Sequence, residues 1–253
     1  MARIFITGAA DGLGRETGRR LAEAGHEVVV HARSAQRLQD ARDGVPGSVG
    51  GVAGDLASLE QTKRLAQEAD ALGPFDVVLH NAGLYVDRER TETEDGFPRI
   101  LQVNVLAPYV LSALMAPPKR LVYLSSGLHR GGTGDLDDLD WTARRWSGSQ
   151  AYADSKLLDV ALAFALARRW EQTAAAAVDP GWVRTKMGGP GAARDLTEGT
   201  DTQAWLCAEA PAAEIDGRYF ASMREEEPHP AARDRAFQDA LLAACAARTG
   251  VEL

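Results

Sequence analysis

A tyrosine and a lysine four residues apart could carry out proton transfer in this chain. They are Tyr152 and Lys156, within a segment of helical periodicity over residues 150–170 that is rich in Ala and Leu. Positions i and i+4 are neighbours on a helix, so the phenol and the ammonium can project into the same space. A phenol titrates at about 10, and a nearby ammonium stabilises the phenolate and lowers that pKa. Tyr152 could then exchange a proton with a carbonyl or an alcohol oxygen.

Two further polar positions could act on the same oxygen. Ser125 and Ser126 follow an apolar run of strand length, and open α/β sheets bind ligands at the carboxyl ends of their strands. A hydroxyl at that place could hydrogen-bond the substrate oxygen. Asn104 lies inside a long apolar segment, where a buried amide needs hydrogen-bonding partners. It could belong to the site, or it could satisfy backbone groups in the core.

A glycine-rich turn precedes these residues. Gly8, Gly12 and Gly14 have the spacing G-x3-G-x-G between an expected strand at residues 3–7 and an expected helix at 12–24. Glycine permits close approach of a phosphate to the backbone, and a helix that begins there presents free N–H groups to it. A tight turn without a ligand would have a similar sequence. The strand–turn–helix context favours dinucleotide binding.

The end of the second expected strand indicates which dinucleotide binds. The sequence there is Val30-His31-Ala32-Arg33-Ser34, with no carboxylate for the adenosine ribose. Arg33 can pair with a 2′-phosphate in a bidentate manner, and Ser34 can donate a hydrogen bond. Asp11, in the glycine turn, is an opposing charge. We therefore expect NADP(H) rather than NAD(H).

The elements that must position these residues alternate along the chain. Strands are expected at residues 3–7, 28–30, 49–53, 76–80, 121–124, 174–178 and 218–221, and helices at 12–24, 59–72, 97–115, 150–170, 200–208 and 230–247. Such alternation predicts an α/β fold with a doubly wound, mostly parallel sheet of seven strands and helices on both faces. No linker or repeat divides the chain, so residues 1–253 are expected to form a single Rossmann domain.

Composition excludes several classes of protein. The chain has 253 residues, is 45% hydrophobic, and carries a net charge of −8. The negative balance disfavours nucleic acid as a partner. No apolar run is long enough to span a membrane, and no His, Cys, Asp or Glu spacing suggests a metal site. The two cysteines, Cys207 and Cys245, are expected to be reduced thiols of a cytoplasmic protein.

Several short motifs follow one another in a characteristic order. They are Thr7–Gly14 with its three glycines; Asp55-Leu56; Asn81-Ala82-Gly83; Asn104; Ser126; Tyr152 with Lys156; and Pro180-Gly181-x-Val183-x-Thr185. Each motif alone is weak, but their order and spacing together are specific. The chain resembles a short-chain dehydrogenase/reductase with a single Rossmann domain.

The resemblance implies a role for each matched residue. Tyr152 would be the general acid in reduction and the base in oxidation, and Lys156 would bind the nicotinamide ribose and lower the pKa of Tyr152. Ser126 would orient the substrate oxygen, and Asn104 would hold a water that links Lys156 to a proton relay. Cofactor contacts are implied for Gly8, Asp11, Gly12, Leu13, Gly14, Asp55, Leu56, Asn81, Ala82, Gly83, Tyr152, Lys156, Pro180, Gly181, Val183 and Thr185, beside Arg33 and Ser34.

The chain departs from the common pattern in ways that point to one branch of the family. His80 stands where the family often has a first Asn, and Tyr152 comes 26 positions after Ser126, a long interval. The long interval is similar to that of the retinol-dehydrogenase-like and WW-domain oxidoreductase-like branch. Residues 127–150 and 186–199 are expected to form a substrate loop and lid. Trp141, Trp146, Trp182 and Met187 could line the pocket or pack locally. His129 could reach the site, but an exposed loop residue is the favoured interpretation.

These observations predict an NADP(H)-dependent oxidoreductase that acts on a carbonyl or a secondary alcohol, with a small, partly apolar substrate. The alternative is a non-catalytic NADP(H)-binding sensor of the same fold. The expected 150–170 helix has an apolar face with Leu158, Leu162, Ala165 and Leu166, which could pack against the core or against a partner subunit in a homo-oligomer. The sequence leaves the substrate and the physiological direction open.

Overall fold

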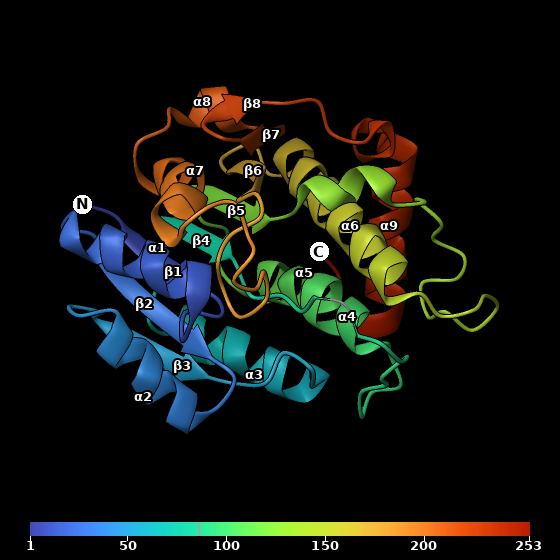
Figure 1. Cartoon of the computed structure of the whole chain (residues 1–253), viewed down its shortest axis with the longest axis horizontal. Coiled ribbons are helices and arrows are strands. Elements are labelled where there is room, and N and C mark those ends of the chain that lie inside the picture. Colours follow the sequence, from blue (N-terminus) through green and yellow to red (C-terminus); the bar gives the residue numbers. More distant parts are fainter. Residues whose placement is uncertain (86) are drawn as a thin grey trace.

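The computed structural model describes residues 1–85 and 87–253, which form one mostly parallel sheet flanked by helices (Figure 1). Its eight strands in this described part run in the order β3-β2-β1-β4-β5-β6-β7-β8, and only β7 and β8 pair in an antiparallel manner. The strands are β1 (Arg3–Ile6), β2 (Glu27–Ala32), β3 (Gly50–Ala53), β4 (Val77–His80), β5 (Arg120–Leu124), β6 (Ala174–Asp179), β7 (Arg218–Ala221) and β8 (Arg224–Glu225).

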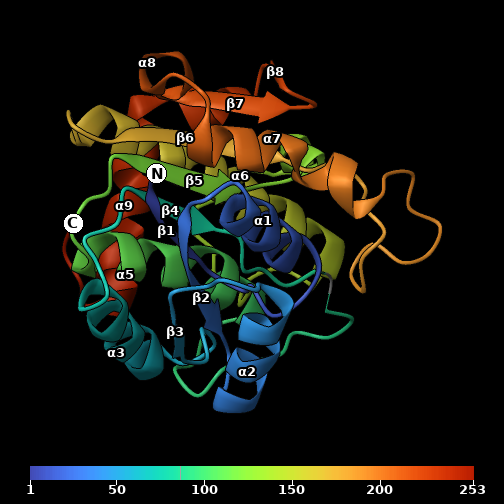
Figure 2. The ribbon, with the colours of Figure 1, turned by 90° about the vertical axis from the view of Figure 1, so that its left-hand side faces the viewer.

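Helices cover both faces of the sheet, as Figure 2 shows from the side of α2 and α3. One face carries α1 (Gly12–Glu23), α2 (Ala35–Gly44) and α7 (Leu196–Ala208), and the other carries α3 (Leu59–Asp70), α5 (Ala107–Leu114) and α6 (Gly148–Arg169). The last helix, α9 (Arg235–Thr249), packs on the outside of α6. Shorter pieces are α4 (Arg99–Leu101), α8 (Ala212–Ile215) and two 3₁₀ turns at Gly127–Gly131 and Pro230–Arg233.

Alternating side chains on each strand build two separate cores. On β5, Leu121 and Tyr123 pack with α5 and α6, while Val122 between them packs on the opposite side. This follows from the two-residue period of a strand, and it requires both faces of the sheet to be apolar. The carboxyl ends of β1, β4, β5 and β6 meet at one edge of the sheet. The strand order reverses between β1 and β4, where open α/β sheets bind their ligands.

The structure corrects several expected elements. The sheet has an eighth strand, β8, because two residues of the turn after β7 fold back on its edge. The helix α2 was not expected, because it is mostly polar and buries only Ala41; the Ser34 side chain caps its first turn. The expected helix at 97–115 contains a π-helical turn, Gln102–Leu106. The expected C-terminal helix is a 3₁₀ turn followed by α9.

The apolar face of α6 is covered within the chain itself. Leu158, Leu162, Ala165 and Leu166 are between 0% and 3% exposed, and α9 and the sheet pack on this helix. A homo-oligomer would therefore have to use another surface. Within the described residues, no helix is long and apolar enough to cross a membrane.

Candidate active site

A cavity of about 640 Å³ opens at the carboxyl ends of the strands. Of the residues expected from the sequence, those that line it are Leu13, Asn81, Gly83, Ser126, Tyr152, Lys156, Pro180, Gly181, Val183 and Thr185. The other expected residues are not part of its lining: Gly8, Asp11, Gly12 and Gly14 belong to the glycine turn, Arg33 and Ser34 follow β2, Asp55 and Leu56 follow β3, and Ala82 and Asn104 lie next to Gly83. The fold thus brings residues from the segments after β1, β4, β5 and β6 and from α6 to one cavity.

Tyr152 enters the cavity from α6 and is only 7% exposed. Burial raises its pKa, and this effect outweighs the lowering by Lys156 and by the hydrogen bond with Ser126. The Lys156 Nζ lies 5.9 Å from the centre of the tyrosine ring. On the other side, the ring of Tyr85 packs edge-on at 4.8 Å. The phenol is therefore protonated at neutral pH, as a proton donor must be.

Lys156 is held by two protein groups. Its Nζ donates to the Leu124 carbonyl at 2.8 Å and to Asp159 Oδ2 at 2.8 Å. Burial alone would lower the pKa of Lys156, but the Asp159 carboxylate outweighs it and the pKa is raised. The lysine is therefore charged. Asp159 was missed in the sequence, although an acidic residue three positions after a lysine in an apolar helix was a usable signal.

The two serines after β5 have different environments. Ser125 is buried, and its Oγ donates to the backbone carbonyl of Lys156 at 2.8 Å. Ser126 lines the cavity together with Tyr152, and its Oγ accepts from the Leu128 N–H at 3.2 Å and helps to lower the pKa of Tyr152. The structure therefore brings Ser126 to the tyrosine, while Ser125 supports α6.

His129 is not the exposed loop residue that we expected. It is fully buried, and its ring packs at 4.6 Å from that of Tyr219. Its Nε2 accepts from the His229 N–H at 3.0 Å, so Nδ1 carries the proton that is donated to the Ser126 carbonyl at 2.7 Å. His129 thus ties the backbone of Ser126 to the C-terminal segment. Residues 100 positions apart supply this burial, which is why the local sequence gave no sign of it.

Asn104 lies in the π-helical turn behind the cavity. Its Oδ1 accepts from the Leu84 N–H at 2.8 Å, and its Nδ2 donates to the Leu84 carbonyl and to Ser155 Oγ. The amide therefore clamps the segment after β4 against α6. Such π turns are frequent at functional sites because they re-aim side chains within a helix.

The glycine turn is packed too tightly for side chains. A Cβ on Gly8 would lie 2.9 Å from the Ala82 Cα, and one on Gly14 would lie 2.5 Å from the Gly8 carbonyl oxygen. Gly12 has φ +51°, which disfavours other residues. Asp11 caps α1 by accepting from the Gly12 N–H. The turn thus places the start of α1 at the edge of the cavity.

Asn81 supplies an unfilled acceptor beside this turn. Its Nδ2 donates to the carbonyls of Thr7 and Gly8, at 2.9 and 3.2 Å. Its Oδ1 is buried and has no partner among the described residues. A buried polar atom without a partner is costly, and this one borders the cavity. The glycine turn and this acceptor fit a bound dinucleotide.

Charges near Ser34 favour an anion. Arg33 is exposed, and Ser34 Oγ accepts from the Arg37 N–H, which leaves the hydroxyl hydrogen free to donate. The opposing carboxylate of Asp11 is paired with Lys186 and, at 3.5 Å, with Arg37. Its negative charge is therefore largely compensated. Nearby, the buried His31 ring links the Gly8 N–H to the Gly54 carbonyl.

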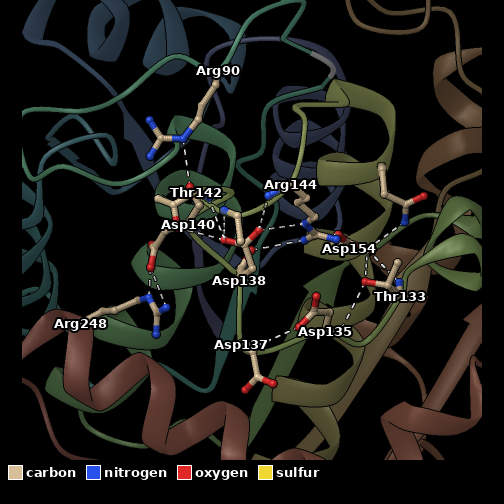
Figure 3. Close-up of polar contacts among 12 residues, drawn as sticks. Arg90, Thr133, Asp135, Asp137, Asp138, Asp140, Thr142, Arg144, Asp154 and Arg248 are labelled. Atoms are coloured by element: carbon tan, nitrogen blue, oxygen red, sulfur yellow. Dashed lines mark hydrogen bonds and ion pairs between the residues drawn. The ribbon is translucent and has the colours of Figure 1, made fainter.

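The segment 127–150, the expected substrate loop, contributes its first two residues to the cavity. Only Gly127 and Leu128 of it line the cavity. Ion pairs join the later part of the segment to α6 and α9, as Figure 3 shows. Arg144 pairs with Asp138 of the same segment and with Asp154 of α6, and Arg248 of α9 pairs with Asp140. Trp141 and Trp146 pack against each other at 5.1 Å, in a satellite core with Ile100 and Ala151.

The last residues of the segment 186–199, the expected lid, belong to a helix. Leu196 begins α7, with Asp195 and Glu198 forming its capping box. Trp182, Met187 and Gly188 do line the cavity, and the Trp182 indole donates to the Gly188 carbonyl at 2.9 Å. In the described part of the chain, no group of three or more His, Cys, Asp or Glu residues could hold a metal ion.

Comparisons with known proteins find relatives along the whole chain. The family model described as short chain dehydrogenase matches residues 2–127. Short-chain dehydrogenase chyC of Penicillium rubens is 39% identical over 100% of this chain and 99% of its own length. Retinol dehydrogenase 14 of Mus musculus is 32% identical over 91% of this chain and 80% of its own length. The crystal structure of an uncharacterized Mycobacterium paratuberculosis protein has a TM-score of 0.84 and 26% identity, covering 100% of this chain and 94% of that one.

Proposed function

Because this chain belongs to the short-chain dehydrogenase family, we propose that it is an NADP(H)-dependent oxidoreductase that interconverts a carbonyl compound and a secondary alcohol. One observation carries the proposal: Ser126, Tyr152 and Lys156 meet at one cavity beside the glycine turn. The cofactor, when bound, supplies or accepts the hydride. The protein positions the reactants and moves the proton.

Tyr152 is the general acid in reduction. Its pKa is raised by burial, so the phenol holds its proton at neutral pH and can deliver it from Oη to the carbonyl oxygen. Ser126 Oγ reaches the same point and donates a hydrogen bond to that oxygen. Lys156 keeps a positive charge beside the tyrosine and stabilises the phenolate that proton transfer leaves. Oxidation uses the same groups in reverse, with Tyr152 as the base.

The cofactor would lie along the edge of the sheet. Gly8, Asp11, Gly12, Leu13 and Gly14 would take the pyrophosphate end, Asp55 and Leu56 the adenine, and Asn81, Ala82, Gly83, Pro180, Gly181, Val183 and Thr185 the rest of the cofactor, including the carboxamide. Arg33 and Ser34 would take the 2′-phosphate, which makes NADP(H) the preferred form. Support comes from the free hydroxyl hydrogen of Ser34 and from the pairing of Asp11 with Lys186.

The substrate side of the cavity favours an uncharged, apolar molecule. Tyr85, Leu128, Trp182 and Met187 line it, and each is at least 45% exposed. When an apolar substrate covers such exposed apolar side chains at the mouth of a cavity, apolar surface is removed from water, and this favours binding. The charged side chains in the lining are Lys156 and Asp179. Because Lys156 is already paired, a substrate carboxylate would meet the Asp179 charge without a free cation.

We also propose that the enzyme is cytoplasmic, and the state of its two cysteines is consistent with this. Cys207 and Cys245 are buried, and burial raises the pKa of each thiol to about 12. Neither thiol is therefore reactive at neutral pH.

A panel of carbonyl compounds tests the function by following the loss of NADPH absorbance. We expect turnover of neutral aryl ketones such as acetophenone and at least tenfold lower kcat/KM for 4-acetylbenzoate, the matched anion. Tyr152→Phe is the control for the proton donor. Tight NADPH binding without turnover of any carbonyl or alcohol would instead support the non-catalytic sensor.

A further inference from the structure

The ammonium of Lys156 has an acidic neighbour on its own helix. Asp159 follows one turn later on α6, and Nζ and Oδ2 are 2.8 Å apart. The two side chains are 5% and 3% exposed, so water screens this pair very little. With the Leu124 carbonyl, Asp159 uses two of the three N–H donors of Lys156. One donor remains for the cavity, which Lys156 lines.

We propose that Asp159 is a positioning residue of the reaction: its carboxylate fixes Lys156 and sets the net charge that Tyr152 experiences. The inference rests on the proposed function, in which Tyr152 transfers the proton. In this proposal Lys156 and Asp159 together set the charge near Tyr152, whereas a lysine without a carboxylate partner would set it alone.

A purely structural role explains this pair poorly. A buried ion pair loses the hydration of both charges, so it stabilises a fold little compared with apolar residues of similar size. The second carboxylate oxygen, Oδ1, is also buried and has no partner among the described residues. The arrangement thus carries a desolvation cost that packing alone does not require. A role in setting the charge at Tyr152 accounts for keeping a carboxylate there.

The groups around the carboxylate are few. Lys156 and Tyr152 lie on α6, and Tyr123 reaches it from β5 with its hydroxyl bonded to Ser112. The strand β6 contributes alanines at this point. Cys245 of α9 is near Tyr123, and burial keeps this thiol protonated. The Tyr123 hydroxyl also keeps its proton, because burial raises its pKa. Lys156 and Asp159 are therefore the charges of α6 that act on Tyr152, and Asp179 in the cavity lining acts on it in the same direction as Asp159.

The effect on Tyr152 has a definite sign. An ionised Asp159 offsets part of the attraction between Lys156 and the phenolate, and so holds the pKa of Tyr152 up. Removing the negative charge leaves the attraction of the Lys156 ammonium for the phenolate unopposed, so Tyr152 loses its proton more easily while Lys156 keeps its charge. Seven residues of helix separate Tyr152 from Asp159, about 10 Å along the axis. At an effective dielectric constant of about 20, a unit charge at that distance shifts a pKa by about one unit.

Asp159→Asn tests the proposal, since it removes the charge and keeps the shape. The pH dependence of kcat/KM for alcohol oxidation reports the basic form of Tyr152. We expect its rising limb to move about one unit to lower pH. Asp154→Asn is the matched control, because Asp154 lies on the same helix but pairs with Arg144; its limb should stay at the wild-type pH. A folded Asp159→Asn protein whose activity falls without any movement of the limb would overturn the proposal.

A second readout needs no turnover. The ultraviolet absorbance of phenolate is titrated in the protein without cofactor, as the difference between each protein and its Tyr152→Phe partner. The same one-unit shift is expected in Asp159→Asn, or in Asp159→Ser if the first variant does not fold. Unshifted phenolate titration refutes the role of Asp159. Absence of turnover in the wild type, with the shift present, refutes only the proposed function.

Discussion

Replacing Arg33 with alanine should reduce the use of NADPH much more than that of NADH. The guanidinium is exposed beside Ser34. No ion pair of Arg33 occurs within residues 1–85 and 87–253, whereas Arg37 is paired with Asp40 at 2.6 Å and with Asp11 at 3.5 Å. The charge of Arg33 is therefore available to a 2′-phosphate. We expect the substitution to weaken the contact with the 2′-phosphate, which is the one group that distinguishes NADPH from NADH.

The size of the effect follows from the exposure of the site. A hydrogen bond to a charged group contributes about 1.5 to 3 kcal/mol, or roughly 10- to 150-fold in affinity. Solvent screens an exposed pair, so we expect the lower end, a fall of about tenfold to thirtyfold in kcat/KM for NADPH. The value for NADH should change less than twofold. The preference of the wild type should also shrink as salt is added, because salt screens exposed charges.

Steady-state kinetics with both cofactors at low and high salt provides the measurement. Arg42→Ala is the matched control, because it removes the same charge from the last turn of α2, about 12 Å from the cap. It should leave the NADPH to NADH ratio nearly unchanged. A wild-type preference for NADH, or an Arg33→Ala enzyme that keeps the wild-type ratio, would refute the reasoning.

Three further perturbations separate catalytic from structural roles. Ser126→Ala should lower kcat by about 100-fold, as the loss of one donor to a reacting oxygen does, while Ser125→Ala should mainly lower the melting temperature; equal loss of kcat in both would contradict this assignment. Asn104→Ala leaves both polar groups of the Leu84 backbone without their partner and removes one of the two hydrogen bonds of Ser155 Oγ, so urea denaturation should show that the free energy of unfolding falls by about 2 to 4 kcal/mol; a fall under 1 kcal/mol would count against the clamp. Burial lowers the pKa of His31 to about 4 and that of His80 to about 3. Unfolded histidine titrates at about 6.5, so these rings contribute stability above that pH which is lost as the pH falls toward 4 and 3, by up to about 1.4 kcal/mol per pH unit for each ring. Melting curves of the wild type and His80→Asn from pH 7 to 4 should show a shallower decline in the variant, and parallel curves would exclude His80 as a cause.

The sequence predicted the parts of the fold that depend on local pattern. Apolar runs that end in glycine or polar residues located the first seven strands, and the glycine turn located the start of α1. It did not predict α2, whose single buried residue gives almost no periodic signal. Nor did it predict β8, which exists only because β7 offers a free edge to two residues.

Side-chain environments were predictable only where neighbours are local. Tyr152 and Lys156 share a helix, so their proximity follows from spacing alone. His129 is buried by Tyr219 and by the backbone of His229, contacts that only the tertiary structure creates. Trp141 and Trp146 are expected either near the carboxyl ends of the strands, at the substrate pocket, or in local packing, and the structure shows them in a satellite core with Ile100 and Ala151. Asp159 was within reach of local reasoning and was missed.

Transfer of hydride with a proton from Tyr152 is the central claim, and isotope transfer tests it most directly. The protein is incubated with NADPH deuterated at the transferred C4 position and a neutral aryl ketone, and the alcohol is analysed by mass spectrometry. The account predicts one deuterium at the carbinol carbon of the wild-type product, and at least 100-fold slower product formation by Tyr152→Phe. Alcohol without deuterium, or a Tyr152→Phe protein as fast as the wild type, would contradict it.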